Sequence, residues 1–73
     1  MNYDDLLKNF GFKLKIVRMK KGLSQVQLAE ILDLHENYIS EIETGKRNIT
    51  LKTINKIANA LEVKELKFFE FED

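Results

Sequence analysis

Apolar residues recur along this chain at the three- and four-residue spacing of an α-helix, and residues that typically end or begin helices separate the helical stretches. The first stretch runs from about Tyr3 to Lys21 and precedes Gly22, a favoured residue just beyond a helix C-terminus. Ser24 and Thr50 are favoured N-caps and precede two later stretches. The pattern predicts an all-α fold.

The same signals predict four further helices, at residues 25–32, 36–44, 51–61 and 63–69. In the third of the five helices, Ile39 and Ile42 should point inward. The expected apolar stripe of the second helix comprises Leu28, Ala29, Ile31 and Leu32. The expected apolar stripe of the fourth helix comprises Leu51, Ile54, Ile57, Ala58 and Leu61. Five short helices with short connections are typical of a helical bundle.

The length of the chain, 73 residues, suits one hydrophobic core, so we expect a single domain over residues 1–73. Because there is no cysteine, neither a disulfide nor a thiolate metal site can brace the fold, and we expect no metal and no cofactor. No apolar run approaches the roughly 20 residues of a membrane span, and the acidic N-terminus differs from the basic start of a signal peptide. We therefore expect a cytoplasmic protein that does not bind membranes.

Charge is balanced overall but unevenly distributed. Residues 1–61 carry ten Lys or Arg against seven Asp or Glu, whereas the Phe-rich tail, residues 62–73, carries two against five. No acidic residue lies between Asp5 and Glu30. The basic residues in that interval are Lys8, Lys13, Lys15, Arg18, Lys20 and Lys21. Such a run indicates either a positive surface that contacts phosphates or an ordinary solvated helix face.

Two short helices at residues 25–32 and 36–44, separated by a three-residue turn, have the dimensions of a helix-turn-helix unit, although any helical corner of this size would share them. Short motifs occur in order through this region: Gly22-Leu23-Ser24-Gln25, Leu28-Ala29, Tyr38-Ile39-Ser40 with Ile42-Glu43, and Gly45-Lys46-Arg47-Asn48. Over residues 10–69 the chain resembles the Cro/CI, or XRE, family of repressors. The resemblance implies a five-helix, lambda-repressor-like DNA-binding domain with the helix-turn-helix at its second and third helices.

Within that family, the chain is most similar to the controller proteins of restriction-modification systems. The motifs that carry this likeness are Asn37-Tyr38-Ile39-Ser40, Arg47-Asn48-Ile49-Thr50, Leu61-Glu62-Val63 and Phe68-Phe69. The likeness implies a transcriptional regulator that binds double-stranded DNA. It also implies an ion pair between Arg18 and Glu43 that braces the domain internally.

Base reading requires polar side chains on the exposed face of the third helix. Asn37 can pair with the N6 and N7 atoms of adenine, Glu36 can accept a hydrogen bond from cytosine N4, and Ser40 lies one turn beyond Asn37. Many controller-like sequences resemble this one with an arginine in place of Glu36, so the resemblance indicates the mode of binding but not the target sequence. Glu41 should exclude wrong bases or pair with a lysine.

Phosphate contacts should flank that helix on both sides. The expected contact residues are Ser24, Gln25, Tyr38, Lys46, Arg47 and Asn48. His35 stands where the third helix begins and should act as a weak N-cap or as a phosphate contact. A metal site at His35 is not expected, because no cysteine or second histidine accompanies it.

The tail contains more aromatic surface than the end of a small monomer should leave in water. Part of this surface should therefore pack inward or against another chain. We expect a homodimer that binds a pseudo-palindromic operator. The expected dimer contacts are Leu66, Phe68, Phe69 and Phe71. An antitoxin or interaction module that binds a protein partner through this tail is the alternative. The chain has no recognisable catalytic motif and no sign of a small-molecule ligand, so we do not expect an enzyme.

Overall fold

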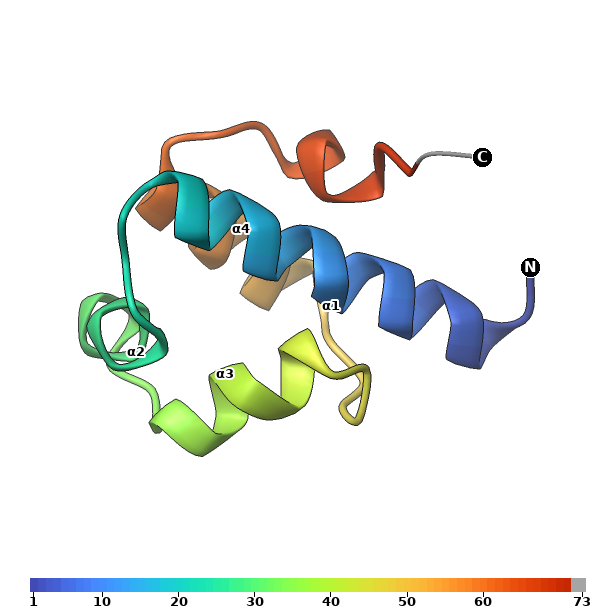
Figure 1. Ribbon diagram of the computed structural model, residues 1–73, viewed down its shortest axis with the longest axis horizontal. Helices are drawn as coiled ribbons and strands as arrows, with labels where there is room; N and C mark the ends of the chain where they lie inside the picture. The colour runs from blue at the N-terminus through green and yellow to red at the C-terminus, as the bar shows by residue number, and fades with distance from the viewer. Residues whose placement is uncertain (72–73) are drawn as a thin grey trace.

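A computed structural model describes residues 1–71 of the chain, and all regular structure in that range is helical (Figure 1). The elements are α1 (Tyr3–Lys20), α2 (Gln25–Leu32), α3 (Glu36–Glu43), α4 (Leu51–Leu61) and the 3-10 helix η1 (Glu65–Phe69). The predicted all-α class is therefore confirmed. None of these helices is both long enough and apolar enough to cross a membrane.

Each α-helix begins with a side-chain cap that satisfies a free backbone N–H group of its first turn. Ser24 and Gln27 form a reciprocal capping box at α2, as their three-residue spacing predicts. Thr50 accepts from the backbone N–H of Thr53 at α4. At α3, Nδ1 of His35 accepts from the backbone N–H of Asn37 at 3.1 Å. The predicted caps at Ser24, His35 and Thr50 are therefore present.

Three helix ends differ from the prediction. Helix α1 ends at Lys20, one residue before the predicted end, because Lys21 is its C-cap. Helix α3 ends at Glu43 rather than Thr44, because Thr44 is its C-cap and Gly45 follows with a left-handed backbone, so that the backbone N–H of Lys46 donates to the carbonyl of Glu41 at 2.8 Å. The predicted fifth helix at residues 63–69 is a 3-10 helix that begins only at Glu65. Its start is delayed because Val63 donates its backbone N–H to the carbonyl of Ala58 at 3.0 Å and so completes the C-terminal cap of α4.

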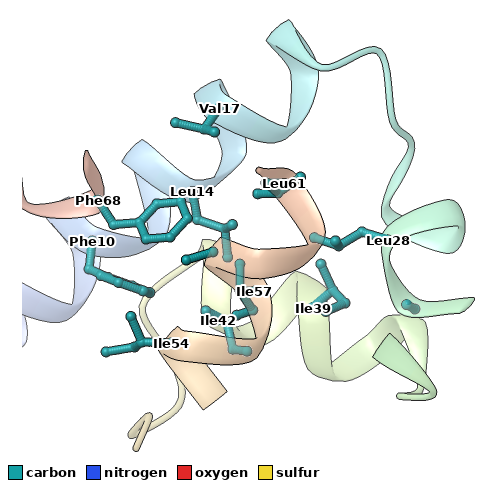
Figure 2. Packing of buried hydrophobic residues seen from close by; sticks show 12 residues of the cluster. Phe10, Leu14, Val17, Leu28, Ile39, Ile42, Ile54, Ile57, Leu61 and Phe68 are labelled. Atoms are coloured by element: carbon teal, nitrogen blue, oxygen red, sulfur yellow. The ribbon is translucent and has the colours of Figure 1, made fainter. Parts of the chain in front are cut away.

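One buried apolar cluster holds all five elements together (Figure 2). Its members are Phe10, Leu14, Val17, Leu28, Ala29, Ile39, Ile42, Ile54, Ile57, Ala58, Leu61 and Phe68. Figure 2 shows Phe68 reaching from η1 to the ring of Phe10, at a centroid distance of 5.5 Å in an edge-to-face arrangement. The 3-10 helix is thus part of the folded core of a single chain.

Two residues of the predicted stripes lie outside this core. Ile31 is 56% exposed, because α2 buries the face that carries Leu28 and Ala29, and Ile31 lies on another side of the helix. Leu51 is 83% exposed, because it is the first residue of α4 and helical side chains lean towards the N-terminus of their helix, here past the edge of the core. The predictions that Ile31 and Leu51 belong to buried stripes are wrong.

Helix α1 lies between α3 on one side and η1 on the other (Figure 1). Gly11 allows α1 and α3 to approach closely, because a side chain at this position would overlap the backbone carbonyls of Ile42 and Glu43. The close packing at Gly11 fixes the C-terminal end of α3 against the middle of α1. It thereby positions the polar face of α3, which carries the predicted base-reading residues.

Candidate nucleic-acid interface

The turn between α2 and α3 sets the angle between these two helices. Asp33 adopts a left-handed backbone with φ of 55°, and the backbone N–H of Leu34 donates to the carbonyl of Ala29 at 2.9 Å. The side chain of Leu34 is half-buried and packs on the core. Together with the cap from His35, these contacts hold α3 in one orientation relative to α2.

Helix α3 buries its two isoleucines and leaves most of its polar residues exposed or half-buried. Ile39 and Ile42 are buried in the core, as predicted. Glu36 and Asn37 are exposed and Ser40 is half-buried. The structure therefore brings the three predicted base-reading residues to the outer surface of one short helix. Side chains of this size and polarity on such a helix can hydrogen-bond to base edges in a major groove.

A buried ion pair ties this helix to α1. Nε of Arg18 lies 2.6 Å from Oε2 of Glu43, and a second guanidinium nitrogen donates to Oε1 at 3.1 Å. A third bond runs from Arg18 to the carbonyl of Leu23 at 2.7 Å. The ion pair that the family resemblance implied is therefore present in this chain. Its two parallel bonds fix the relative orientation of the guanidinium and the carboxylate.

Gln25 joins the same network and links it to α2. Its side-chain amide nitrogen donates to Oε1 of Glu43 at 3.0 Å. One amide N–H is thereby occupied, which leaves the second N–H and the amide oxygen for other partners. Ser24 is exposed beside it, at the N-terminus of α2. The sequence patterns did not indicate the bond between Gln25 and Glu43, because the two residues meet only once the three helices have packed.

The loop after α3 carries two exposed basic residues and an exposed asparagine. Lys46, Arg47 and Asn48 are all exposed. The guanidinium of Arg47 lies 4.9 Å from the centre of the Tyr38 ring, and its Nε lies 3.5 Å from a carboxylate oxygen of Glu41. Glu41 therefore pairs with an arginine of the following loop rather than with a lysine, and its other expected role, the exclusion of wrong bases, stays a prediction. Arg47 thus lies along α3, between Tyr38 and Glu41.

The tail packs differently from the prediction. Phe68 is fully buried in the core of its own chain, so it is not available to contact a second subunit, and its assignment to a dimer interface is wrong. The reason is the 3-10 geometry of η1, which turns Phe68 inward and leaves Leu66 75% exposed and Phe69 38% exposed. Phe71 is half-buried beside Phe69, with ring centres 6.2 Å apart.

A shallow apolar groove of about 130 Å³ lies beside the exposed part of the tail. Its lining residues are Tyr3, Leu6, Leu7, Phe10, Ile49, Ile54 and Phe69. Nearby, Glu65 of η1 accepts a hydrogen bond from the side-chain amide of Asn55 on α4 at 2.7 Å. The bond from Asn55 lowers the pKa of Glu65 below its ordinary value. It also links η1 to α4 at the surface.

Comparison with known proteins places this geometry among DNA-binding regulators. The sequence pattern of the helix-turn-helix family matches residues 14–68. The control protein C.BamHI of Bacillus amyloliquefaciens is 44% identical over 63 residues, which cover 85% of this chain and 78% of that protein. The structure of the restriction-modification controller C.AhdI from Aeromonas hydrophila superposes with a TM-score of 0.82 at 40% identity, over 89% of this chain and 97% of the other.

A further solved structure shows a similar protein with nucleic acid. The restriction-modification controller C.Esp1396I, solved as a tetramer in complex with its natural 35 base-pair operator, superposes with a TM-score of 0.78 at 42% identity. The superposition covers 89% of this chain and 86% of that chain. Similarity thus extends over nearly the whole of both molecules.

Proposed function

Since this chain belongs to the helix-turn-helix family, we propose that it is a sequence-specific DNA-binding transcriptional regulator of the restriction-modification controller type. The observation that carries the proposal is the similarity over 89% of the chain to a controller solved in complex with its operator. The exposed polar face of α3, held by a buried network to α1 and α2, supports it from the geometry.

In this proposal α2 and α3 form the helix-turn-helix unit, and α3 enters the major groove. Asn37 pairs with an adenine, because its amide can both donate to and accept from the same base edge. Glu36 and Ser40 contact neighbouring bases from the same face. The carboxylate of Glu36 accepts only, which favours the exocyclic amine of cytosine.

Phosphate contacts position this face and carry no base information themselves. Ser24 and Gln25 contact one phosphate backbone through the N-terminus of α2, where backbone N–H groups point outward. Lys46, Arg47 and Asn48 contact the other side of the groove, with the hydroxyl of Tyr38. The network from Arg18 through Glu43 to Gln25 holds these two sets of contacts at a fixed separation.

The regulator binds as a homodimer in this proposal, through Leu66, Phe69 and Phe71 and the apolar groove beside them. A symmetric dimer of this kind places two copies of α3 about 34 Å apart, one turn of B-DNA, and so reads two half-sites. Burial of Phe68 within the monomer leaves less tail surface for a foreign protein. The antitoxin alternative therefore loses Phe68 as a contact, as the homodimer does.

Selection of bound sequences from a random pool of DNA duplexes tests the proposed function. We expect enrichment of an inverted repeat whose half-sites are centred about one helical turn apart. Replacement of Asn37 by Ala should reduce the preference for the selected operator over random duplex by about 1–3 kcal/mol, since one bidentate base contact is lost. Recovery of no common sequence would contradict the proposal, and unchanged discrimination by the variant would contradict the role of Asn37.

Arg47→Ala is the matched comparison for that variant. Arg47 is proposed to contact phosphate, so its loss should weaken binding to operator and random duplex equally. It should also lower the slope of log affinity against log salt by about 0.9 for each protomer. A change in base preference with Arg47→Ala would instead place this residue among the base-reading groups.

A further inference from the structure

The lysines of α1 fall on two different edges of the helix. Gly11 and Arg18 mark the edge that faces α3, through the close backbone approach and the ion pair to Glu43. Lys8 lies three residues before Gly11 and therefore on the same edge. Lys13 lies on the opposite edge, where it lines a groove of about 230 Å³ together with residues 70–71 of the tail. The basic run of α1 is thus not one continuous surface.

Lys8 is the lysine that the structure ties to the loop after α3. Gly45 adopts a left-handed backbone with φ of 75°, and a Cβ atom built on it would lie 2.8 Å from Cγ of Lys8 and 2.9 Å from its Cα. Gly45 therefore packs its backbone directly on the first turns of α1 and on the stem of this side chain. The adjacent loop residues are the proposed phosphate contacts, Lys46, Arg47 and Asn48.

Lys8 is exposed and has no ion-pair partner in the described part of the chain. Arg47 differs, because it is partly occupied by Glu41 and by the ring of Tyr38. A lysine held by its stem beside a basic loop, with its ammonium free, is suited to bind a phosphate as a point charge.

We propose that Lys8 is a phosphate-binding residue, which contacts the same stretch of DNA backbone as the loop after α3. The proposal rests on the proposed function and extends the phosphate-binding surface to a third element, α1. The contact positions the protein on the duplex and carries no base preference, since the phosphate backbone is the same at every sequence. Gly45 is the structural link, because its lack of a side chain lets α1 lie against this loop.

The test measures the salt dependence of DNA binding by the full-length protein, with the selected operator and with a random duplex of equal length. Lys8→Gln removes one charge from the α3 edge, and Lys13→Gln removes one charge from the opposite edge of the same helix. We expect Lys8→Gln to lower the slope of log affinity against log salt by about 0.9 for each protomer on both duplexes. We expect Lys13→Gln to keep the wild-type slope, and Lys8→Arg to keep it as well.

Equal slopes for Lys8→Gln and the wild type would overturn the proposal. Equal reductions by Lys8→Gln and Lys13→Gln would also overturn it, because they would reflect total charge rather than a contact. A reduced slope with Lys8→Arg would also overturn the proposal, because arginine keeps the positive charge and should keep the phosphate contact. If the wild type itself failed to prefer any duplex sequence, the proposed function would fail, which is a separate result. Thermal unfolding of each variant checks that the fold is retained.

Discussion

The two sides of α1 are held by different kinds of interaction. On the α3 side, a buried charged network joins Arg18, Glu43 and Gln25. On the η1 side, the contact is aromatic, with the ring of Phe10 lying 5.5 Å from that of Phe68 and 5.3 Å from that of Phe69. Directional hydrogen bonds fix the angles of the groups that they join, whereas apolar packing tolerates adjustment. The side that carries the proposed base-reading helix therefore has the more strictly defined geometry.

Removal of Glu43 should give the largest effect on stability. Glu43→Ala leaves the buried guanidinium of Arg18 without its carboxylate, and an uncompensated buried charge costs about 3–5 kcal/mol. Glu41→Ala is the control, since the pair of Glu41 with Arg47 is half-exposed and should contribute less than about 1 kcal/mol. Urea unfolding followed by circular dichroism measures both. Similar losses of unfolding free energy for the two variants would show that the buried network stabilises the α3 side no more than the exposed pair does.

Truncation of the Phe68 side chain tests the η1 side of α1. Phe68→Ala should destabilise the chain by about 3 kcal/mol, because it removes a fully buried ring and leaves a cavity against Phe10. Phe12→Ala makes the same chemical change at a ring that is 60% exposed, and should cost less than about 1 kcal/mol. The unfolding free energies of the two variants provide the comparison. If they agreed, the burial of Phe68 in the monomer would be contradicted.

Much of the fold could be predicted because its signals are local. The caps at Ser24 and Thr50 depend on the three following residues, and the inward position of Ile39 and Ile42 depends on helical periodicity alone. Exposure of Leu51 could not be predicted in this way, because it depends on where the first turn of α4 lies relative to other helices. Periodicity identifies a helical face but not how far its partner extends.

Phe68 and Phe69 show the same limit at the tail. Adjacent phenylalanines carry equivalent sequence signals, and only the 3-10 geometry of η1 decides that Phe68 is buried and Phe69 partly exposed. In the candidate site, the pairing of Arg18 with Glu43 was implied by resemblance to a family, since 25 residues separate the two partners. The contacts of Gln25 with Glu43 and of Arg47 with Tyr38 arise from packing between elements.

The proposed dimer contact gives a smaller expected effect. Leu66→Ser should raise the dissociation constant of the dimer at least tenfold, because burial of one leucine side chain contributes about 1.5 kcal/mol or more. Sedimentation equilibrium measures the change. Met19→Ser is the control, since Met19 is 59% exposed on the C-terminal part of α1 and lies outside the proposed interface. An unchanged dimer with Leu66→Ser would move the interface to another surface.

The smallest expected effect concerns the surface bond that joins η1 to α4. The bond from Asn55 lowers the pKa of Glu65, so the folded state favours the carboxylate. A lowered pKa in the folded state contributes stability that is present above the unfolded pKa and is lost as the pH falls through the folded pKa. Asn55→Ala should therefore raise the pKa of Glu65 towards its ordinary value and remove this acid-side contribution.

A titration of the Glu65 carboxyl group followed by NMR measures that shift directly. Asn59→Ala is the matched control, since Asn59 is exposed one turn further along the same helix, and it should leave the pKa of Glu65 unchanged. The same pKa in the wild type and in Asn55→Ala would mean that the bond does not persist in solution. In that case η1 would be held to the rest of the chain by apolar packing, chiefly that of Phe68 in the core, and the two sides of α1 would differ even more sharply.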